Sequence, residues 1–165
     1  MNWYLVHTKP RQENVALDNL LRQSYECYMP TLLAEKIRKG QLTLVEEPLF
    51  PRYIFIRLGL GLEAKSWGPI RSTLGVSRLV RFGSEPAKVP DELIALLQDN
   101  EARIKNSPKK IFEPGQRVVI TQGPFVGLEG VFQTNDGEQR VMILIEILSK
   151  TVSMKLDLKE IKQVV

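Results

Sequence analysis

The residues that could serve in nucleophilic catalysis are one histidine, His7, and one cysteine, Cys27. A cysteine becomes an efficient nucleophile when a histidine takes its proton, so the fold would have to bring these two side chains into hydrogen-bond reach. No motif surrounds either residue, and the pattern favours a strand histidine and a partly buried thiol. One cysteine excludes an internal disulfide, and one cysteine with one histidine excludes a Cys/His zinc set.

Phosphate binding and acid–base catalysis by carboxylates would each need a recognisable pattern of residues. The stretch Gly59-Leu60-Gly61 lacks the third glycine and the Lys-Ser/Thr ending that a phosphate-binding loop requires. The carboxylates are scattered and mostly neighbour Lys or Arg. The sequence therefore predicts no catalytic set, no metal site and no cofactor, which leaves a binding or regulatory protein.

The bulk composition is that of an ordinary globular protein, with 165 residues, 43% hydrophobic and 25% charged. A net charge of +4 permits a nucleic-acid partner without requiring one. The N-terminus has no apolar core long enough for a signal peptide, and no stretch approaches the roughly 20 apolar residues of a membrane span. We expect a cytoplasmic, monomeric protein with no membrane partner.

The elements that would position a binding surface follow an order of strands and helices typical of an α+β sandwich, with helices stacked on a mostly antiparallel sheet. Thr8-Lys9-Pro10 predicts the start of the first helix, because Thr is a good cap and Pro suits a first turn. The expected strands are 2–7, 26–37, 41–47 (joined to the preceding strand around Lys39-Gly40), 53–60 and 76–82, and the expected helices are 8–24, a short one after 66–73, and one from Pro90.

The stretch EPLFPRYIFIRL, residues 47–58, poses a question about the second face of its strand. Alternate strand residues point to opposite faces, so Ile54, Ile56 and Leu58 predict an ordinary core face. Tyr53 and Phe55 then lie on the other face. Two aromatic rings there predict a second partner surface.

The C-terminal third changes composition. Residues 100–113 predict a linker, or a helix end followed by a linker, which separates domains 1–99 and 114–165. Strands are expected at 117–122, 127–134, 140–148 and 151–156, which form a small five-strand barrel if 160–164 also pairs, with Asn135-Asp136-Gly137 as a turn. Residues 138–150 carry acid first and base last, which also suits a helix, although their alternating β-branched residues favour strand.

Two sets of residues resemble a known family. Residues 115–130, GQRVVITQGPFVGLEG, resemble a KOW motif, the core of a small β-barrel. WYLVHTKPRQE, EPLFPRYIFIRL and GVSRLVRFG are similar to the N-terminal domain of NusG-type transcription elongation factors, and the domain order matches over essentially the whole chain. Within that family the sequence is most similar to the specialised RfaH branch, because the chain is short and contains EPLFPRY and STLGVSRLVRFG followed by VP.

The resemblance implies two binding surfaces on the N-terminal domain. An apolar cavity would bind the clamp helices of RNA polymerase, and the matching positions are Trp3, Leu5, His7, Pro51, Tyr53 and Phe55. A second surface would contact the non-template DNA strand, and its matching positions are Lys9, Gln12, Arg22, Gln23, Arg71 and Thr73. Two departures from the RfaH pattern concern the polymerase gate loop and the DNA element: Ser66-Trp67-Gly68-Pro69 replaces a His-Thr-Thr-Thr run, and Leu74 replaces a basic residue.

The resemblance also implies that the C-terminal domain has two folds, a helical hairpin that covers the cavity and a barrel that recruits a small-subunit ribosomal protein. The implied interdomain residues are Glu47, Arg140, Phe125, Leu128, Val131 and Phe132, with Glu47 and Arg140 as an ion pair, and the implied ribosome contact is Leu148. Gly127, Gly130 and Gly137 would each cost about 1 kcal/mol inside a helix, which favours the barrel.

The resulting expectation is an elongation and antitermination factor that is recruited by a DNA element, reduces pausing and termination, and links transcription to translation. It would not be an enzyme. A general NusG factor that binds all elongating polymerases, with Rho as a further partner, is the first alternative. A ribosome-associated KOW RNA-binding protein is the second, and the mild net charge argues against it because bulk RNA binding needs many phosphate contacts.

Overall fold

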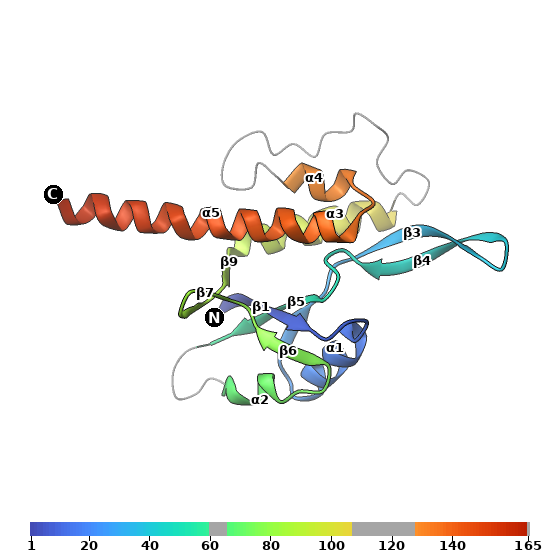
Figure 1. Cartoon of the computed structure of the whole chain (residues 1–165), viewed down its shortest axis with the longest axis horizontal. Coiled ribbons are helices and arrows are strands. Elements are labelled where there is room, and N and C mark those ends of the chain that lie inside the picture. Colours follow the sequence, from blue (N-terminus) through green and yellow to red (C-terminus); the bar gives the residue numbers. More distant parts are fainter. Residues whose placement is uncertain (60–65, 107–127, 165) are drawn as a thin grey trace. The chain divides into compact units, whose positions relative to one another are not determined.

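The computed structural model describes residues 1–59, 66–106 and 128–164 (Figure 1). The chain divides into two compact units, Met1–Lys109 and Lys110–Val165. The elements of the first unit are β1 (Asn2–Thr8), α1 (Glu13–Arg22), β2 (Glu26–Tyr28), β3 (Thr31–Arg38), β4 (Gln41–Pro48), β5 (Tyr53–Leu58), α2 (Gly68–Arg71), β6 (Val76–Leu79), β7 (Arg81–Phe82), β8 (Glu85–Pro86), β9 (Lys88–Val89) and α3 (Asp91–Asn106). The elements of the second unit are α4 (Leu128–Gln133) and α5 (Gly137–Val164).

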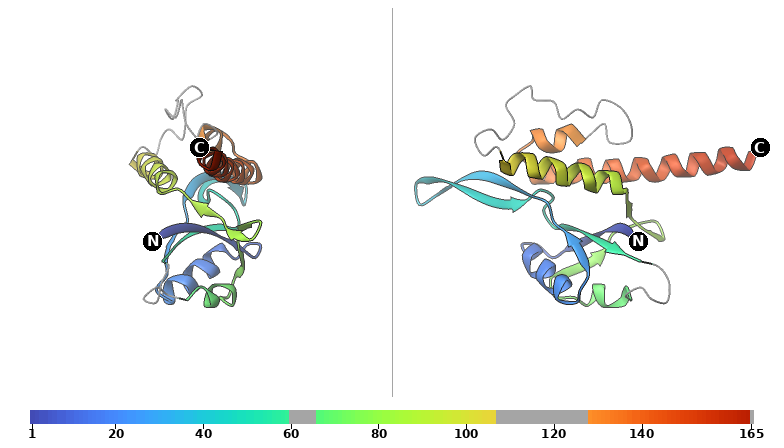
Figure 2. Two further views of the ribbon diagram at one scale, coloured as in Figure 1. Left: turned by 90° about the vertical axis from the view of Figure 1, so that its left-hand side faces the viewer. Right: turned by 180° about the vertical axis from the view of Figure 1, so that it is seen from behind.

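The first unit is built on an antiparallel sheet in the order β2-β5-β1-β6, with β9 also paired to β1. Helices α1 and α2 lie on one side of this sheet and α3 lies on the other (Figures 1 and 2). Ile54, Ile56 and Leu58 are buried on the α1 side, as the alternation of the strand predicts. Their hydrophobic cluster also contains Tyr4, Val6, Ala16, Leu20, Tyr25, Ile70, Val76 and Leu79.

The first helix begins later than the capping pattern predicts. Thr8 is the last residue of β1, and α1 begins at Glu13, so the prediction of a cap at Thr8 is wrong. The main chain at this corner is already engaged, because Thr8 N donates to Arg52 O at 2.8 Å and Lys9 N donates to Gly75 O at 2.8 Å. These long-range bonds keep the chain extended at the sheet edge, and helix formation starts only beyond them.

The predicted strand 26–37 is divided in two. Met29-Pro30 interrupts it, because proline has no N–H to donate to a ladder, and Leu49 N instead donates to Pro30 O at 2.8 Å. Strands β3 and β4 then form a separate two-stranded ribbon that extends from the main sheet (Figure 2). Lys39 and Gly40 both have positive φ, at 52° and 74°, as the predicted tight hairpin turn requires.

Helix α3 continues to Asn106, past the expected domain end at residue 99. Its Glu101 side chain accepts hydrogen bonds from Tyr28 Oη at 2.6 Å and from the Thr31 hydroxyl at 3.2 Å. These bonds connect the end of α3 to β2 and the base of β3. Residues 100–106 are helical, as the helix-end alternative expects, and the rest of the expected linker, 107–113, lies outside the described residues.

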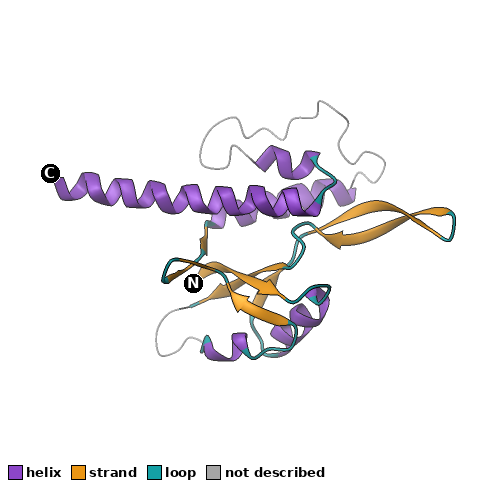
Figure 3. Cartoon of the chain, in the orientation of Figure 1, coloured by secondary structure: helices purple, strands orange, loops and turns teal. Residues whose placement is uncertain are grey.

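The described residues of the second unit are helical (Figure 3). Helices α4 and α5 occupy residues where strands were expected, at 127–134 (described from 128 onward), 140–148, 151–156 and 160–164. For residues 138–150 a helix was the alternative, and the KOW barrel stays a prediction. The expected strand 117–122 and Phe125 lie outside the described residues.

Two features of the second unit make the helices compatible with its glycines. Gly137 is the first residue of α5, where Asp136 Oδ1 accepts a hydrogen bond from Glu138 N at 3.0 Å and caps the helix. Gly130 faces α5, and a Cβ there would lie 3.0 Å from Ile143 Cδ1. Gly137 is at the helix start, so the free-energy cost expected for a glycine inside a helix does not apply to it in full. At Gly130 the cost remains, but the absence of a side chain there allows the two helices to approach closely.

Candidate binding faces

The second face of the main sheet, which we call the outer face, brings most of the predicted apolar site together. The strand register pairs Trp3 with Arg57, Leu5 with Phe55, and His7 with Tyr53 across β1 and β5. Opposite residues of an antiparallel pair lie on the same face, so five of the six predicted polymerase-binding residues share this surface. The register also places Glu26 and Tyr28 of β2, Arg78 of β6 and Val89 of β9 on the outer face.

An aromatic group lies across the middle of the outer face. The Phe55 ring stacks on Tyr28, with centroids 6.2 Å apart and planes at 22°, and meets Phe50 edge-on at 6.1 Å. Leu5 and Phe55 are fully buried. Burial, followed by the hydrogen bond to Glu101, raises the pKa of Tyr28 far above its ordinary value.

Pro51, the sixth predicted residue, lies in the turn that leads into β5. Arg52 fixes this turn in a left-handed conformation with φ of 72°. Its main-chain N donates to Glu13 Oε1 at 3.2 Å, and its Nε donates to Thr8 O at 3.2 Å. Pro51 is half-buried.

The two ends of the outer face differ in charge. At one end, Arg57 Nη1 lies 3.3 Å from Glu26 Oε2, so the cation has its own carboxylate. At the other end, the His7 ring lies 5.0 Å from the Tyr53 ring, and Arg78 is paired with His7 across β1 and β6. Burial, then the charges of Arg52 and Arg78, lower the pKa of His7.

The predicted DNA-contact residues lie at the two ends of α1 and at the end of α2 and just after it, and we call this set the α1 strip. Gln23 Nε2 donates to Thr73 Oγ1 at 2.7 Å, and that hydroxyl donates to Pro69 O at 2.8 Å. Thr73 is buried. The two hydrogen bonds connect the end of α1 to α2 and the segment after it. These bonds give Gln23 and Thr73 a structural role that the sequence did not indicate.

The remaining residues of the α1 strip present charge to the surface. Arg22 and Arg71 are exposed, as is Lys9, whose main-chain N bonds Gly75. Gln12 is half-buried at the start of α1. Lys9 thus precedes α1, Arg22 is its last residue and Arg71 is the last residue of α2. A shared DNA-contact surface for these cations stays a prediction.

Ser66 to Pro69, where the sequence departs from the RfaH pattern, has packing roles in the first unit. Trp67 meets Tyr4 edge-on at 4.8 Å, and its Nε1 donates to Gly59 O at 3.1 Å. Tyr25 Oη donates to Ser66 O at 2.7 Å. Trp67 thus packs against the core cluster on the α1 side of the sheet.

The predicted residues of the second unit that the structure describes are buried in its helices. They are Leu128, Val131 and Phe132 of α4, and Arg140 and Leu148 of α5. Arg140 Nη1 donates to Thr134 O at 3.1 Å within this unit. Glu47, in the first unit, lies 3.0 Å from Lys36 Nζ. The predicted ion pair between Glu47 and Arg140 stays a prediction.

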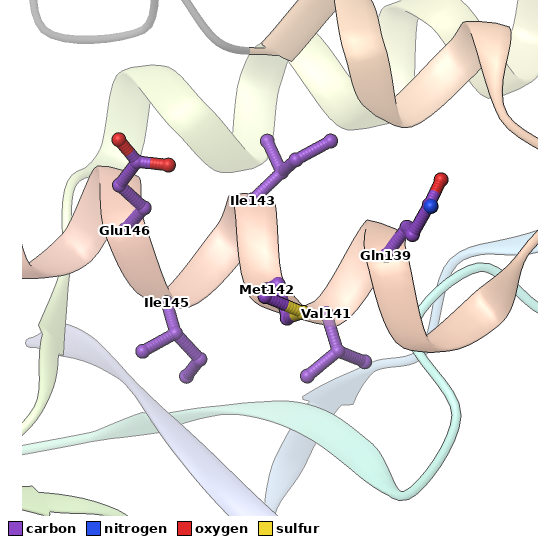
Figure 4. Close-up of a pocket in the computed structure, with 6 residues that line it drawn as sticks. All are labelled: Gln139, Val141, Met142, Ile143, Ile145 and Glu146. Carbon is purple, nitrogen blue, oxygen red and sulfur yellow. The ribbon is translucent and has the colours of Figure 1, made fainter.

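One hollow in the structure is lined by side chains of α5 (Figure 4). Val141, Met142 and Ile145 project from one side of the helix and are apolar. The rest of the lining is Gln139, Ile143 and Glu146. In the described ranges, no three His, Cys, Asp or Glu side chains gather as a metal site would require. No described helix is long and apolar enough to cross a membrane.

Comparison with known proteins gives matches to NusG proteins. The family model described as "Transcription termination factor nusG" matches residues 1–98. The transcription termination/antitermination protein NusG of Thermus thermophilus is 28% identical over 98% of this chain and 97% of its own length. NusG of Escherichia coli K12 is 27% identical over 92% of this chain and 85% of its own. A solved structure described as "Domain interaction in Thermotoga maritima NusG" matches with a TM-score of 0.40 and 23% identity, covering 71% of this chain and 68% of that one.

Proposed function

The chain belongs to the NusG family of transcription termination and antitermination factors, and we propose that it binds the clamp helices of RNA polymerase through the outer face of its sheet. It acts by contact and not by catalysis, which agrees with a family of transcription factors. Binding across the clamp would hold the polymerase closed on DNA, so that pausing and termination are reduced.

The observation that carries this proposal is the grouping of Trp3, Leu5, His7, Tyr53 and Phe55 on one face of the sheet. The core cluster lies on the opposite face, so these residues are not needed to pack α1. Aromatic side chains bury a large area at a small cost in conformational entropy and are typical anchors of protein interfaces.

The test compares two full-length variants for binding to RNA polymerase core enzyme. Tyr53→Ala removes a half-buried ring from the outer face, and we expect binding to weaken about tenfold or more. Leu42→Ala removes an exposed apolar side chain from the ribbon and serves as the matched control. Equal affinities of the two variants and the wild type would refute the proposal.

A finer proposal assigns the α1 strip to the non-template DNA strand. Its exposed cations suit phosphate contacts, and glutamine suits base edges. We expect Arg22→Ala and Arg71→Ala to weaken binding to elongation complexes that contain this strand, and to have no effect on complexes that lack it. Arg38→Ala, which removes the same charge from the tip of the ribbon, is the control.

The C-terminal unit is proposed to cover the outer face as a helical hairpin, held by Glu47 and Arg140, and to form a KOW barrel after release. Leu148 is buried in α5, so a contact with a small-subunit ribosomal protein would need this released form. Helical circular dichroism of the full chain, replaced by strand signal in separated residues 113–165, is expected. Identical signals from residues 113–165 in both contexts would contradict switching.

A general NusG factor is the alternative favoured by the names of the curated relatives, which are termination/antitermination proteins. Such a factor acts without a dedicated DNA element and has Rho as a further partner. Association with randomly chosen elongation complexes would support the general factor. Association that requires one sequence in a paused complex would support recruitment by a DNA element.

A further inference from the structure

We propose that His7, Arg52 and Arg78, at one end of the outer face, form a docking site for a carboxylate of the polymerase. This proposal rests on the proposed function, because it specifies the chemistry of the partner at the same face. The three residues are called the cationic end below.

The cationic end is assembled from three separate parts of the fold. Strand register places Arg78 of β6 and Tyr53 of β5 on either side of His7. A shift in register between His7 and Thr8 accompanies this arrangement, and it lets Arg78 share the outer face while Leu79 and Val76 both remain in the core. Arg52 comes from the turn before β5, which is held against the end of β1 because Thr8 N donates to Arg52 O and Arg52 Nε donates to Thr8 O.

One buried polar atom in this group has no partner. His7 Nδ1 is inaccessible and makes no hydrogen bond within the described part of the chain. A buried nitrogen without a partner costs free energy, so natural proteins rarely leave one unless a ligand, water or partner protein satisfies it. Arg57 Nε, at the opposite end of the outer face, is buried without a partner in the same way, so the charges distinguish the two ends.

The charges around His7 favour an acidic group as the partner of this end of the outer face. Among the residues that the structure describes, no carboxylate pairs with the guanidinium of Arg52 or of Arg78. The carboxylate of Glu13 accepts a hydrogen bond from the main-chain N of Arg52 and not from its guanidinium. At the other end of the outer face, by contrast, Arg57 has Glu26. A partner carboxylate would supply the missing charge and accept hydrogen bonds from both arginines.

A protein carboxylate fits this place better than a phosphate of nucleic acid. The cationic end continues directly into Tyr53 and the aromatic group around Phe55, which suit the apolar and aromatic anchors of a protein interface. Anchors of this kind give affinity, whereas a charged pair at the edge fixes orientation and speeds association. The carboxylate would thus set the direction in which a clamp helix lies on the sheet.

The test uses the full-length protein and elongation complexes assembled with and without the non-template strand. Arg78→Glu reverses one charge of the cationic end, and Arg38→Glu makes the same charge change at the distant ribbon tip. We expect Arg78→Glu to weaken binding about tenfold relative to Arg38→Glu, equally in both complexes. Arg78→Gln changes an exposed side chain without reversing its charge and is expected to show a smaller loss, and thermal melting checks that both variants fold.

A charge swap on the polymerase gives the sharpest support. Each Asp or Glu of the clamp helices is replaced with lysine in turn, and one of these polymerase variants should restore the binding of Arg78→Glu and weaken that of the wild type. Equal binding of Arg78→Glu and Arg38→Glu would overturn the carboxylate site and leave the proposed function standing. A loss seen only when the non-template strand is present would assign the site to a phosphate. Failure of Tyr53→Ala to weaken binding would refute the proposed function itself.

Discussion

Gly75 joins the α1 strip to the sheet, and replacing it with alanine should destabilise the first unit strongly. Its φ is +90°, and a Cβ would lie 2.8 Å from Ala16 N and 3.1 Å from Ala16 Cα. Those atoms belong to the backbone of α1, so they cannot move aside as a flexible side chain does. Gly75 O also accepts the hydrogen bond from Lys9 N, which holds the start of this corner.

The magnitude has two parts. The left-handed conformation costs about 1–2 kcal/mol for a residue with a Cβ. Overpacking against a backbone that must shift costs about 1–3 kcal/mol more. We therefore expect Gly75→Ala to lower the free energy of unfolding by about 2–5 kcal/mol.

Gly83→Ala is the matched control, because Gly83 has φ of +64° and a Cβ added there would meet nothing within 4 Å. It should show only the conformational part. Urea denaturation followed by fluorescence reports on this unit, since both tryptophans, Trp3 and Trp67, lie in it. If Gly75→Ala is no more destabilising than Gly83→Ala, the close packing of this segment on α1 is not as described.

Three further predictions concern other contacts. Tyr28→Phe removes the hydrogen bond to Glu101 and should lower stability by about 1–2 kcal/mol in denaturant titrations. Because the pKa of Tyr28 is raised, the wild type should also lose stability as pH rises above about 10, and Tyr28→Phe should lose less. Burial raises the pKa of the Cys27 thiol to about 12, so folded protein should react with iodoacetamide at pH 8 far more slowly than urea-unfolded protein does; equal rates would contradict this. Asp136→Ala removes the cap of α5 and should reduce helical circular dichroism at 222 nm, with a cost of about 1 kcal/mol; an unchanged spectrum and melting temperature would count against the capping role.

The stretch EPLFPRYIFIRL, which contains β5, shows what hydrophobic periodicity can and cannot predict. Alternation correctly separated Ile54 and Ile56 from Tyr53 and Phe55, because side-chain direction along a strand is a local property. The alternation did not identify Tyr28 as the stacking partner of Phe55. That contact depends on β2 pairing with β5, which is a long-range choice.

Element ends were predicted less well than the elements themselves. The Thr8 cap failed because main-chain bonds to Arg52 and Gly75 compete with the start of a helix. Helix α3 extends past the expected domain end at residue 99, and there Glu101 accepts hydrogen bonds from Tyr28 and Thr31. In both places, the contacts at the end of the element involve partners distant in sequence.

The sequence by itself determined the alternation of the main sheet, the hairpin at Lys39-Gly40 and the family resemblance, because strand period, turn chemistry and motif spacing are all carried by neighbouring residues. The tertiary structure alone decided which side chains share a surface. His7, Arg52 and Arg78 are brought together by the pairing of three strands and by one shift in register. No local sequence pattern predicts that these three residues lie close together, because the packing of the whole sheet sets the strand register.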